Sequence, residues 1–124
     1  MKKQLKIGVI GAGRIGKLHA FNLATRVPGA KLTAVSDVDK KSAEKLAAEL
    51  GIPAVYSDYK KLLADPEVEA VFICSSTDTH SKISAAAAKA GKHIFCEKPI
   101  DHNIAKIKSV LDAVKESGVK YQVG

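Results

Sequence analysis

Three glycines near the amino terminus have the spacing of a phosphate-binding loop. Gly11, Gly13 and Gly16 form a G-x-G-x-x-G pattern directly after a short apolar run at 7–10 that is typical of a β-strand. The first glycine allows a sharp turn, the second lets the backbone approach a pyrophosphate, and the third lets the following helix pack closely. Amides at the start of that helix lack intrahelical partners and lie at the positive end of its dipole. The spacing therefore predicts a dinucleotide site.

An acidic residue follows the next expected strand at the distance typical of a ribose ligand. Asp37 lies about 20 residues beyond the glycine loop. A carboxylate there accepts hydrogen bonds from adenosine ribose hydroxyls and repels a 2′-phosphate, which favours NAD over NADP. Helix capping is the alternative role at this point of the chain, and we assign it to Asp39. Lys40 and Lys41 lie close enough to weaken the discrimination against NADP.

Size and composition bound the class of protein. The 124 residues, 46% of them hydrophobic, suit one domain (1–124) with its own core. We expect a cytoplasmic protein, since no apolar run reaches the ~18 residues of a membrane span and the first residues lack a secretory pattern. Cys74 and Cys96 match neither a zinc site nor a disulfide framework, so no metal is expected. The net charge of +7 is spread over the helices, with three Tyr and three Phe, which does not favour a nucleic-acid surface.

Apolar residues alternate between short strand-like runs and longer helical stripes, as a parallel sheet covered by helices requires. The expected strands cover 7–10, 32–36, 54–56, 69–74, 92–96 and 119–123, and the expected helices cover about 14–27, 40–50, 58–64, 80–90 and 103–117. Right-handed crossovers then give the strand order 3-2-1-4-5-6. The sequence therefore predicts an α/β fold with a doubly wound parallel sheet, the Rossmann fold.

Apolar stripes at helical spacing should face this sheet. The stripes are Gly16, Ala20, Leu23 and Val27 in the first helix, Ile83, Ala86, Ala87 and Ala90 in the fourth, and Ile104, Ile107, Leu111 and Val114 in the fifth. Each stripe predicts a buried helix face.

Four loops are expected to meet at the carboxyl ends of the first and fourth strands, where a doubly wound sheet binds its ligand. They are 11–16, the residues after Asp37, 75–80 and 97–99. The third loop offers hydroxyls to a ribose or a nicotinamide ring, although helix capping is an equally good role for Thr77 and its neighbours. His80 is either a cofactor contact or a buried, hydrogen-bonded structural residue. Lys98 precedes a proline, which keeps its backbone out of the helical region, so it could be aimed at a substrate hydroxyl or form a surface charge pair.

Several segments together resemble the amino-terminal half of the sugar and cyclitol dehydrogenases grouped with glucose-fructose oxidoreductase and inositol dehydrogenase. The matching segments are GAGRIGKLHA (11–20), SDVD (36–39), CSSTDTH (74–80) and HIFCEKP (93–99). The EKP element after the fifth strand is specific to this family in a way that the glycine loop is not.

The resemblance implies NAD as the cofactor and gives roles to individual residues. The implied cofactor-binding residues are Gly11, Gly13, Arg14, Ile15, Gly16 and Asp37, with Ser75, Thr77, His80 and Glu97 near the nicotinamide half. Lys98 is the implied catalytic lysine. The family reaction is oxidation of a secondary alcohol on a cyclitol or sugar, in which the nicotinamide ring accepts a hydride.

One departure from the family is large. Family members continue into a second α/β substrate domain with a catalytic Asp and His four residues apart, whereas no histidine here has an aspartate four positions earlier. We therefore expect NAD binding with little or no turnover. The alternatives are an NAD-sensing regulatory module and half of an enzyme completed by another chain. Surface that a second domain would cover is expected to favour self-association.

Overall fold

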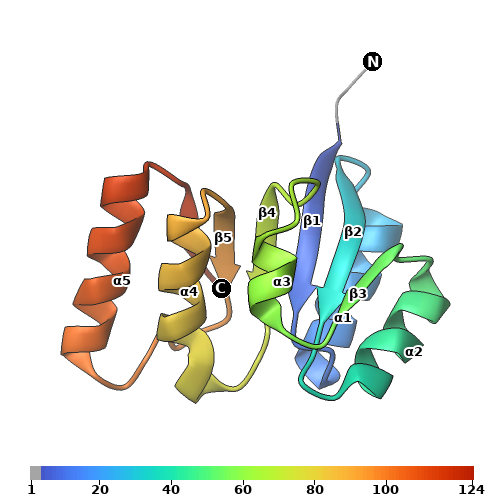
Figure 1. Cartoon of the computed structure of the whole chain (residues 1–124), viewed down its shortest axis with the longest axis horizontal. Coiled ribbons are helices and arrows are strands. Elements are labelled where there is room, and N and C mark those ends of the chain that lie inside the picture. The colour runs from blue at the N-terminus through green and yellow to red at the C-terminus, as the bar shows by residue number, and fades with distance from the viewer. Residues whose placement is uncertain (1–3) are drawn as a thin grey trace.

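Six short strands run parallel to one another in the computed structural model, which describes residues 4–124 (Figure 1). The strands are β1 (Leu5–Ile10), β2 (Ala30–Ser36), β3 (Ala54–Tyr56), β4 (Ala70–Ile73), β5 (His93–Cys96) and β6 (Tyr121–Val123). Their order across the sheet is β3-β2-β1-β4-β5-β6. This order confirms the predicted Rossmann topology, in which the chain reverses its direction of winding between β1 and β4.

Strands β1 and β4 end level with each other at the centre of the sheet. Ile10, the last residue of β1, pairs with Ile73, the last residue of β4. The Cys74 amide then donates a hydrogen bond to the Ile10 carbonyl oxygen (2.8 Å). The loops that follow these two strands therefore start side by side, at the edge where a doubly wound sheet opens its ligand crevice.

Five α-helices cover the sheet. They are α1 (Arg14–Arg26), α2 (Lys40–Leu50), α3 (Tyr59–Leu63), α4 (His80–Lys89) and α5 (Ile104–Ser117), and a 3₁₀ turn, η1 (Thr77–Thr79), precedes α4. Helices α3, α4 and α5 lie in front of the sheet in Figure 1, and α1 lies behind it. Helix α2 has its predicted ends, because Asp39 accepts a hydrogen bond from the Lys41 amide and Gly51 is left-handed (φ 69°).

Two apolar layers hold these helices to the sheet. Val9 and Leu46 belong to the layer beneath α1 and α2, whereas Ile10 and Ile83 belong to the layer beneath α3 and α4. Consecutive residues of β1 thus enter opposite layers, as strand geometry requires. The central strands are buried on both faces, and the loops expected to meet at the ligand crevice extend from their ends.

The prediction of a buried stripe on α5 is wrong for two of its four residues. Ile104 is 83% exposed and Leu111 is 50% exposed, whereas Val110, outside the predicted stripe, is 1% exposed. Ile107 and Val114 are partly buried. Helix α5 packs chiefly against α4, so the face that it buries is rotated away from the most apolar stripe. Periodicity identifies an apolar face but does not show which neighbour covers it.

The stripes predicted for α1 and α4 fail only at their last members. Val27 and Ala90 are exposed. Each residue follows the end of its helix, because α1 ends at Arg26 and α4 ends at Lys89. Val27 has an extended backbone (φ −121°, ψ 92°), so helical spacing no longer fixes the direction of its side chain, whereas Ala90 keeps a helical backbone and lies exposed at the C-cap of α4.

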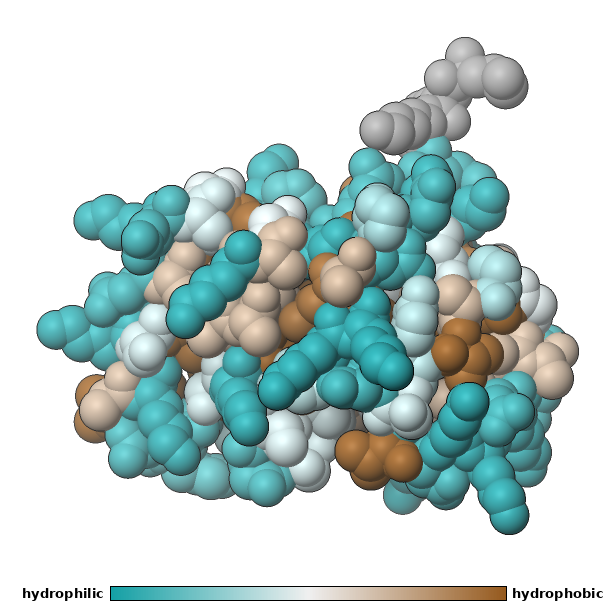
Figure 2. Space-filling view, viewed as in Figure 1, coloured by the Kyte–Doolittle hydropathy of each residue, from teal (hydrophilic) through white to brown (hydrophobic). Residues whose placement is uncertain are grey.

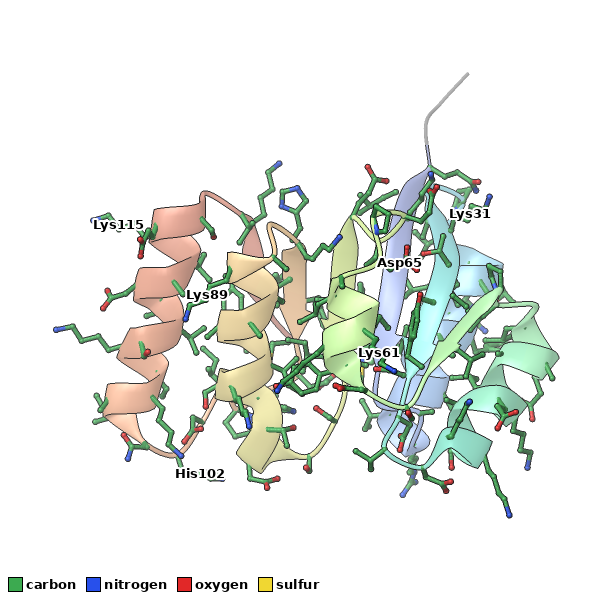
Figure 3. The ribbon with its side chains drawn as sticks, viewed as in Figure 1. Lys31, Lys61, Asp65, Lys89, His102 and Lys115 are labelled. Atoms are coloured by element: carbon green, nitrogen blue, oxygen red, sulfur yellow. The ribbon has the colours of Figure 1, made fainter. Side chains whose placement is uncertain are left out.

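Basic side chains are distributed over the surface. Lys31, Lys61, Lys89 and Lys115 come from β2, α3, α4 and α5, and all four are exposed (Figure 3). Hydrophilic side chains cover much of this face, and apolar ones lie among them, in Figure 2. Within residues 4–124, no helix is long and apolar enough to cross a lipid bilayer. No cluster of His, Cys, Asp and Glu in the same range could hold a metal ion.

Candidate cofactor site

Contacts within the protein explain why two of the three loop positions must be glycine. Gly11 has a φ of 102°, and a Cβ on it would lie 2.7 Å from the backbone of Cys74 and Ser75. A Cβ on Gly16 would lie 1.7 Å from the Gly11 carbonyl oxygen, so α1 packs directly on the loop. A Cβ on Gly13 would meet no atom of residues 4–124 within 4 Å. The space beside Gly13 is therefore open to a group outside the protein.

Gly13 also lies at the N-terminus of α1. Its extended backbone (φ −79°, ψ −161°) caps the helix, and among the described residues no side chain caps it. The first turn holds no acidic residue, and Arg14 and Ile15 are exposed there. The free amides of this turn and the positive end of the helix dipole suit an anion such as a diphosphate.

Asp37 connects the end of β2 to the glycine loop. Its Oδ2 accepts a hydrogen bond from the Ala12 amide (2.7 Å), and its Oδ1 accepts one from the Asp39 amide (2.8 Å). Each carboxylate oxygen has two lone pairs, so each keeps acceptor capacity for a ligand hydroxyl. The carboxylate thus orders the loop and faces the adjoining cleft.

A cleft of about 310 Å³ lies along the carboxyl edge of the sheet. The residues that line it include Gly11, Gly13, Asp37, Ser75, Thr79 and Tyr59. Three of the four predicted loops therefore meet at one cleft. Tyr59 follows β3, and the sequence prediction does not include this loop. The signal was available, since β3 is parallel to β2 and must end at the same edge of the sheet.

The loop after β4 presents hydroxyls and a thiol to this cleft. The Ser75 and Thr79 hydroxyl oxygens lie 2.8 Å apart and are hydrogen-bonded. Burial, with a smaller contribution from the Glu97 carboxylate, raises the pKa of the Cys74 thiol to about 12. Cys74 is therefore a neutral thiol at ordinary pH and lines the cleft without serving as a nucleophile. Thr77 begins η1 and is not among the residues that line the cleft.

His80 is buried and connects the loop after β4 with the loop after β5. The residue is 2% exposed. Its Nδ1 lies 2.8 Å from the Pro99 carbonyl oxygen, and its Nε2 lies 2.8 Å from the Ser75 carbonyl oxygen. Both ring nitrogens thus contact backbone carbonyls. The sequence leaves open whether His80 is a cofactor contact or a buried structural residue, and this arrangement corresponds to the structural role.

Glu97 and Lys98 follow β5 and lie beyond the residues that line the cleft. The Lys98 side chain is exposed, and its amide donates a hydrogen bond to the Gly124 carbonyl oxygen (2.9 Å). The Glu97 carboxylate is hydrogen-bonded to His19 of α1. His19 is a residue that sequence reasoning leaves unassigned, because a contact across so many residues has no signature in local spacing.

The fold and this cleft define the chain as a dinucleotide-binding domain. The family described as an oxidoreductase family with an NAD-binding Rossmann fold matches residues 5–124. The chain belongs to this family, the Gfo/Idh/MocA oxidoreductases, and NAD is the family's cofactor. The resemblance inferred from the sequence motifs is thereby confirmed.

Several curated relatives of the chain are inositol dehydrogenases. The scyllo-inositol 2-dehydrogenase (NAD(+)) of Bacillus subtilis is 45% identical over 124 residues, which cover all of this chain and 36% of that protein. The myo-inositol 2-dehydrogenase of Thermotoga maritima is 44% identical over 115 residues, which cover 93% of this chain and 34% of that protein. The chain thus spans about a third of the length of these relatives and corresponds to their NAD-binding domain.

Solved structures agree with this assignment. Scyllo-inositol dehydrogenase from Lactobacillus casei, solved with bound NAD(H) and scyllo-inositol, superposes with a TM-score of 0.94 at 36% identity. The match covers 98% of this chain and 36% of that one. The chain is therefore an inositol-dehydrogenase-like, NAD-binding oxidoreductase domain.

Proposed function

We propose that the cleft binds NAD with the diphosphate at the N-terminus of α1 and the adenosine ribose at Asp37. The open space beside Gly13 carries this proposal, because no contact within residues 4–124 requires a glycine there. A pyrophosphate that approaches the backbone closely would explain why a glycine is needed at this position. The implied contacts of Arg14 and Ile15 belong to the same end of α1, where both residues are exposed.

The nicotinamide half would extend from Asp37 across β1 towards β4 and β5. Ser75 lines the cleft, and its hydroxyl oxygen, which donates to Thr79, keeps lone pairs that can accept a hydrogen bond from the ligand. His80 would act through Ser75, whose carbonyl oxygen its ring contacts. Thr77, in η1, and Glu97, after β5, complete the proposed set from outside the residues that line the cleft.

Lys98 is the proposed catalytic residue. Its exposed ammonium follows β5 at the carboxyl edge of the sheet, where it can donate a hydrogen bond to the reacting hydroxyl of a cyclitol or sugar. Bound NAD supplies the hydride acceptor for oxidation of that alcohol. A fixed positive charge near the hydroxyl stabilises the negative charge that develops on oxygen as the proton leaves.

We expect residues 4–124 to bind NAD without turning over substrate on their own. Two of the four histidines lie near the site, and both have partners: His80 contacts two carbonyl oxygens, and His19 contacts Glu97. Both rings are thus already engaged by other groups, which disfavours either one as the base for a hydroxyl held by Lys98. Loss of a general base alone costs about 10²- to 10⁴-fold in rate.

Calorimetric titration of the chain with NAD and with NADP tests the binding proposal. We expect saturable heat with NAD and weaker binding of NADP, because Asp37 repels a 2′-phosphate. Absorbance of NADH with myo-inositol and with scyllo-inositol tests turnover in the same preparation. Absence of heat would overturn the assigned cleft, and steady NADH production would overturn only the expectation of binding without turnover.

Self-association is a further part of the proposal. Ile104 and Leu111 form an exposed apolar row on α5, and apolar surface of this kind favours contact with a second copy. Light scattering at increasing concentration should show a mass above that of the monomer.

A further inference from the structure

His19 and Glu97 form a hydrogen-bonded pair that bridges α1 and the end of β5. His19 Nε2 contacts Glu97 Oε1, and the two side chains are 22% and 26% exposed. A carboxylate partner makes this bond charge-assisted, and partial burial limits its competition with water. The pair therefore fixes the Glu97 side chain against α1.

Two aromatic rings hold His19 in place for this bond. The Phe72 and Phe95 rings stack with centroids 4.5 Å apart, and the His19 ring lies 5.6 Å from the first and 5.4 Å from the second. The imidazole is tilted against both rings, by 58° and 62°. Such packing restricts the ring to few orientations, so its Nε2 stays directed at Glu97.

The pair connects the diphosphate part of the proposed NAD site to its nicotinamide end. His19 lies on the helix whose N-terminus is capped by Gly13 of the glycine loop, and Glu97 immediately precedes Lys98. The Glu97 amide also donates a hydrogen bond to the Ile73 carbonyl oxygen (3.2 Å), which extends the β4–β5 ladder by one residue. Anchoring of Glu97 therefore restricts the backbone that carries Lys98.

We infer that His19 is a positioning residue, which holds Glu97 and thereby places the Lys98 loop relative to the phosphate-binding helix. This inference rests on the proposed function in one respect: the loop matters for the nicotinamide half only if NAD lies along the cleft. We predict that loss of the pair affects one part of the NAD site and not the other. Loss of the pair should weaken contacts with the nicotinamide half and leave the adenosine and diphosphate contacts intact.

Three variants isolate the hydrogen bond from the packing. His19→Phe keeps an aromatic ring against Phe72 and Phe95 but cannot donate to Glu97, whereas His19→Gln keeps a donor. His93→Gln is the matched control, because His93 is a partly buried histidine at the other end of β5 whose Nδ1 accepts from the Lys120 amide.

Amide hydrogen exchange measures the position of the loop without any ligand. In His19→Phe, exchange of the Glu97 amide should become at least about tenfold faster, and exchange of the buried Val9 amide should not change. His19→Gln should restore most of the protection, and His93→Gln should have no effect at Glu97. Unchanged exchange at Glu97 in His19→Phe would overturn the inference, as would equal acceleration at Val9.

Calorimetry with NAD and with ADP-ribose supplies the second measurement, since these ligands differ only in the nicotinamide group. In His19→Phe, NAD affinity should fall about 3- to 10-fold while ADP-ribose affinity stays within twofold of the original. Equal losses for the two ligands would contradict a positioning role. If the unaltered chain bound neither ligand, the proposed function would fail, and hydrogen exchange alone would decide the role of His19.

Discussion

The two halves of the sheet differ in their helical cover and in the number of contacts that form the site. Around β1 and β2, helices cover both faces, and the glycine loop, Asp37 and the cleft form one connected unit. Around β5, the helical cover comes from α4, and α5 packs on α4 and exposes Ile104 and Leu111. Here the His19 side chain reaches from α1 to the Phe95 ring of β5 and to Glu97, which follows β5.

This difference separates two functional tasks. The half that would hold adenosine and diphosphate derives its geometry from backbone contacts within residues 4–124. The half that would hold nicotinamide and substrate depends on a few side-chain links and ends in exposed surface. The first half should therefore be sensitive to small substitutions at its loop, and the second half should tolerate changes at the surface of α5.

The largest expected effect on stability is that of a substitution at Gly16. Gly16→Ala places a methyl group 1.7 Å from the Gly11 carbonyl oxygen, so α1 or the loop must move. We expect a loss of about 3 kcal/mol in the free energy of unfolding, the upper end for overpacking. Gly13→Ala is the matched control: it should cost under about 1 kcal/mol, since a Cβ there meets no described atom.

Thermal unfolding of the two alanine variants gives the comparison, and NAD titration completes it. Gly13→Ala should weaken NAD binding by about tenfold or more, which is ~1.4 kcal/mol. Equal thermal stability of the two variants would show that the loop is less rigid than its contacts indicate.

Asp37→Ala should have the next largest effect. We expect NAD binding to weaken by about 1 to 3 kcal/mol through loss of charge-assisted hydrogen bonds to the ribose. Asp39→Ala is the control, because it removes the cap of α2 at a cost of about 1 kcal/mol in stability and should leave NAD affinity unchanged. Calorimetry that found equal affinities for the Asp37 and Asp39 variants would exclude Asp37 from the site.

Within the second half, Val110 and Leu111 provide an adjacent pair. Val110→Ala should destabilise the fold by about 1 to 3 kcal/mol, because Val110 is buried and the change leaves a cavity. Leu111→Ala should cost less, under about 1 kcal/mol, since half of that side chain is already exposed. Urea unfolding measures both. The reverse ranking would mean that another surface covers Leu111 in solution.

The smallest expected effect on stability is at Ile104. Ile104→Lys should change the free energy of unfolding by under about 0.5 kcal/mol, as is usual for exposed positions. The same variant should reduce self-association measured by light scattering, because it places a charge in the apolar row of α5. An unchanged association constant would place the contact elsewhere.

Local and topological signals account for what the sequence could predict. Helix α2 follows from Asp39, a regular apolar stripe and Gly51, all of which act within a few residues of one another. The sheet order follows from alternating strands and helices together with right-handed crossovers. Most of the loops that meet at the cleft follow from that order, because parallel strands end at one edge.

Long-range packing accounts for what the sequence could not predict. The exposed position of Ile104 depends on where α4 lies, and helical periodicity contains no information about that neighbour. The pairing of His19 with Glu97 and the two carbonyl contacts of His80 depend on the final three-dimensional positions of separate loops. These contacts and the exposure of Ile104 become visible only in the three-dimensional structure.

The two backbone contacts of Asp37 have a consequence for protein engineering. A designer who wishes to retarget the domain towards a phosphorylated cofactor would remove the negative charge at this position, which in the proposed site repels a 2′-phosphate. That change also takes away the acceptor for the Ala12 amide, on which the shape of the neighbouring turn depends. Cofactor exchange in this scaffold therefore requires a neutral replacement that still accepts a hydrogen bond, such as Asn or Ser, because charge and loop geometry are encoded by one side chain.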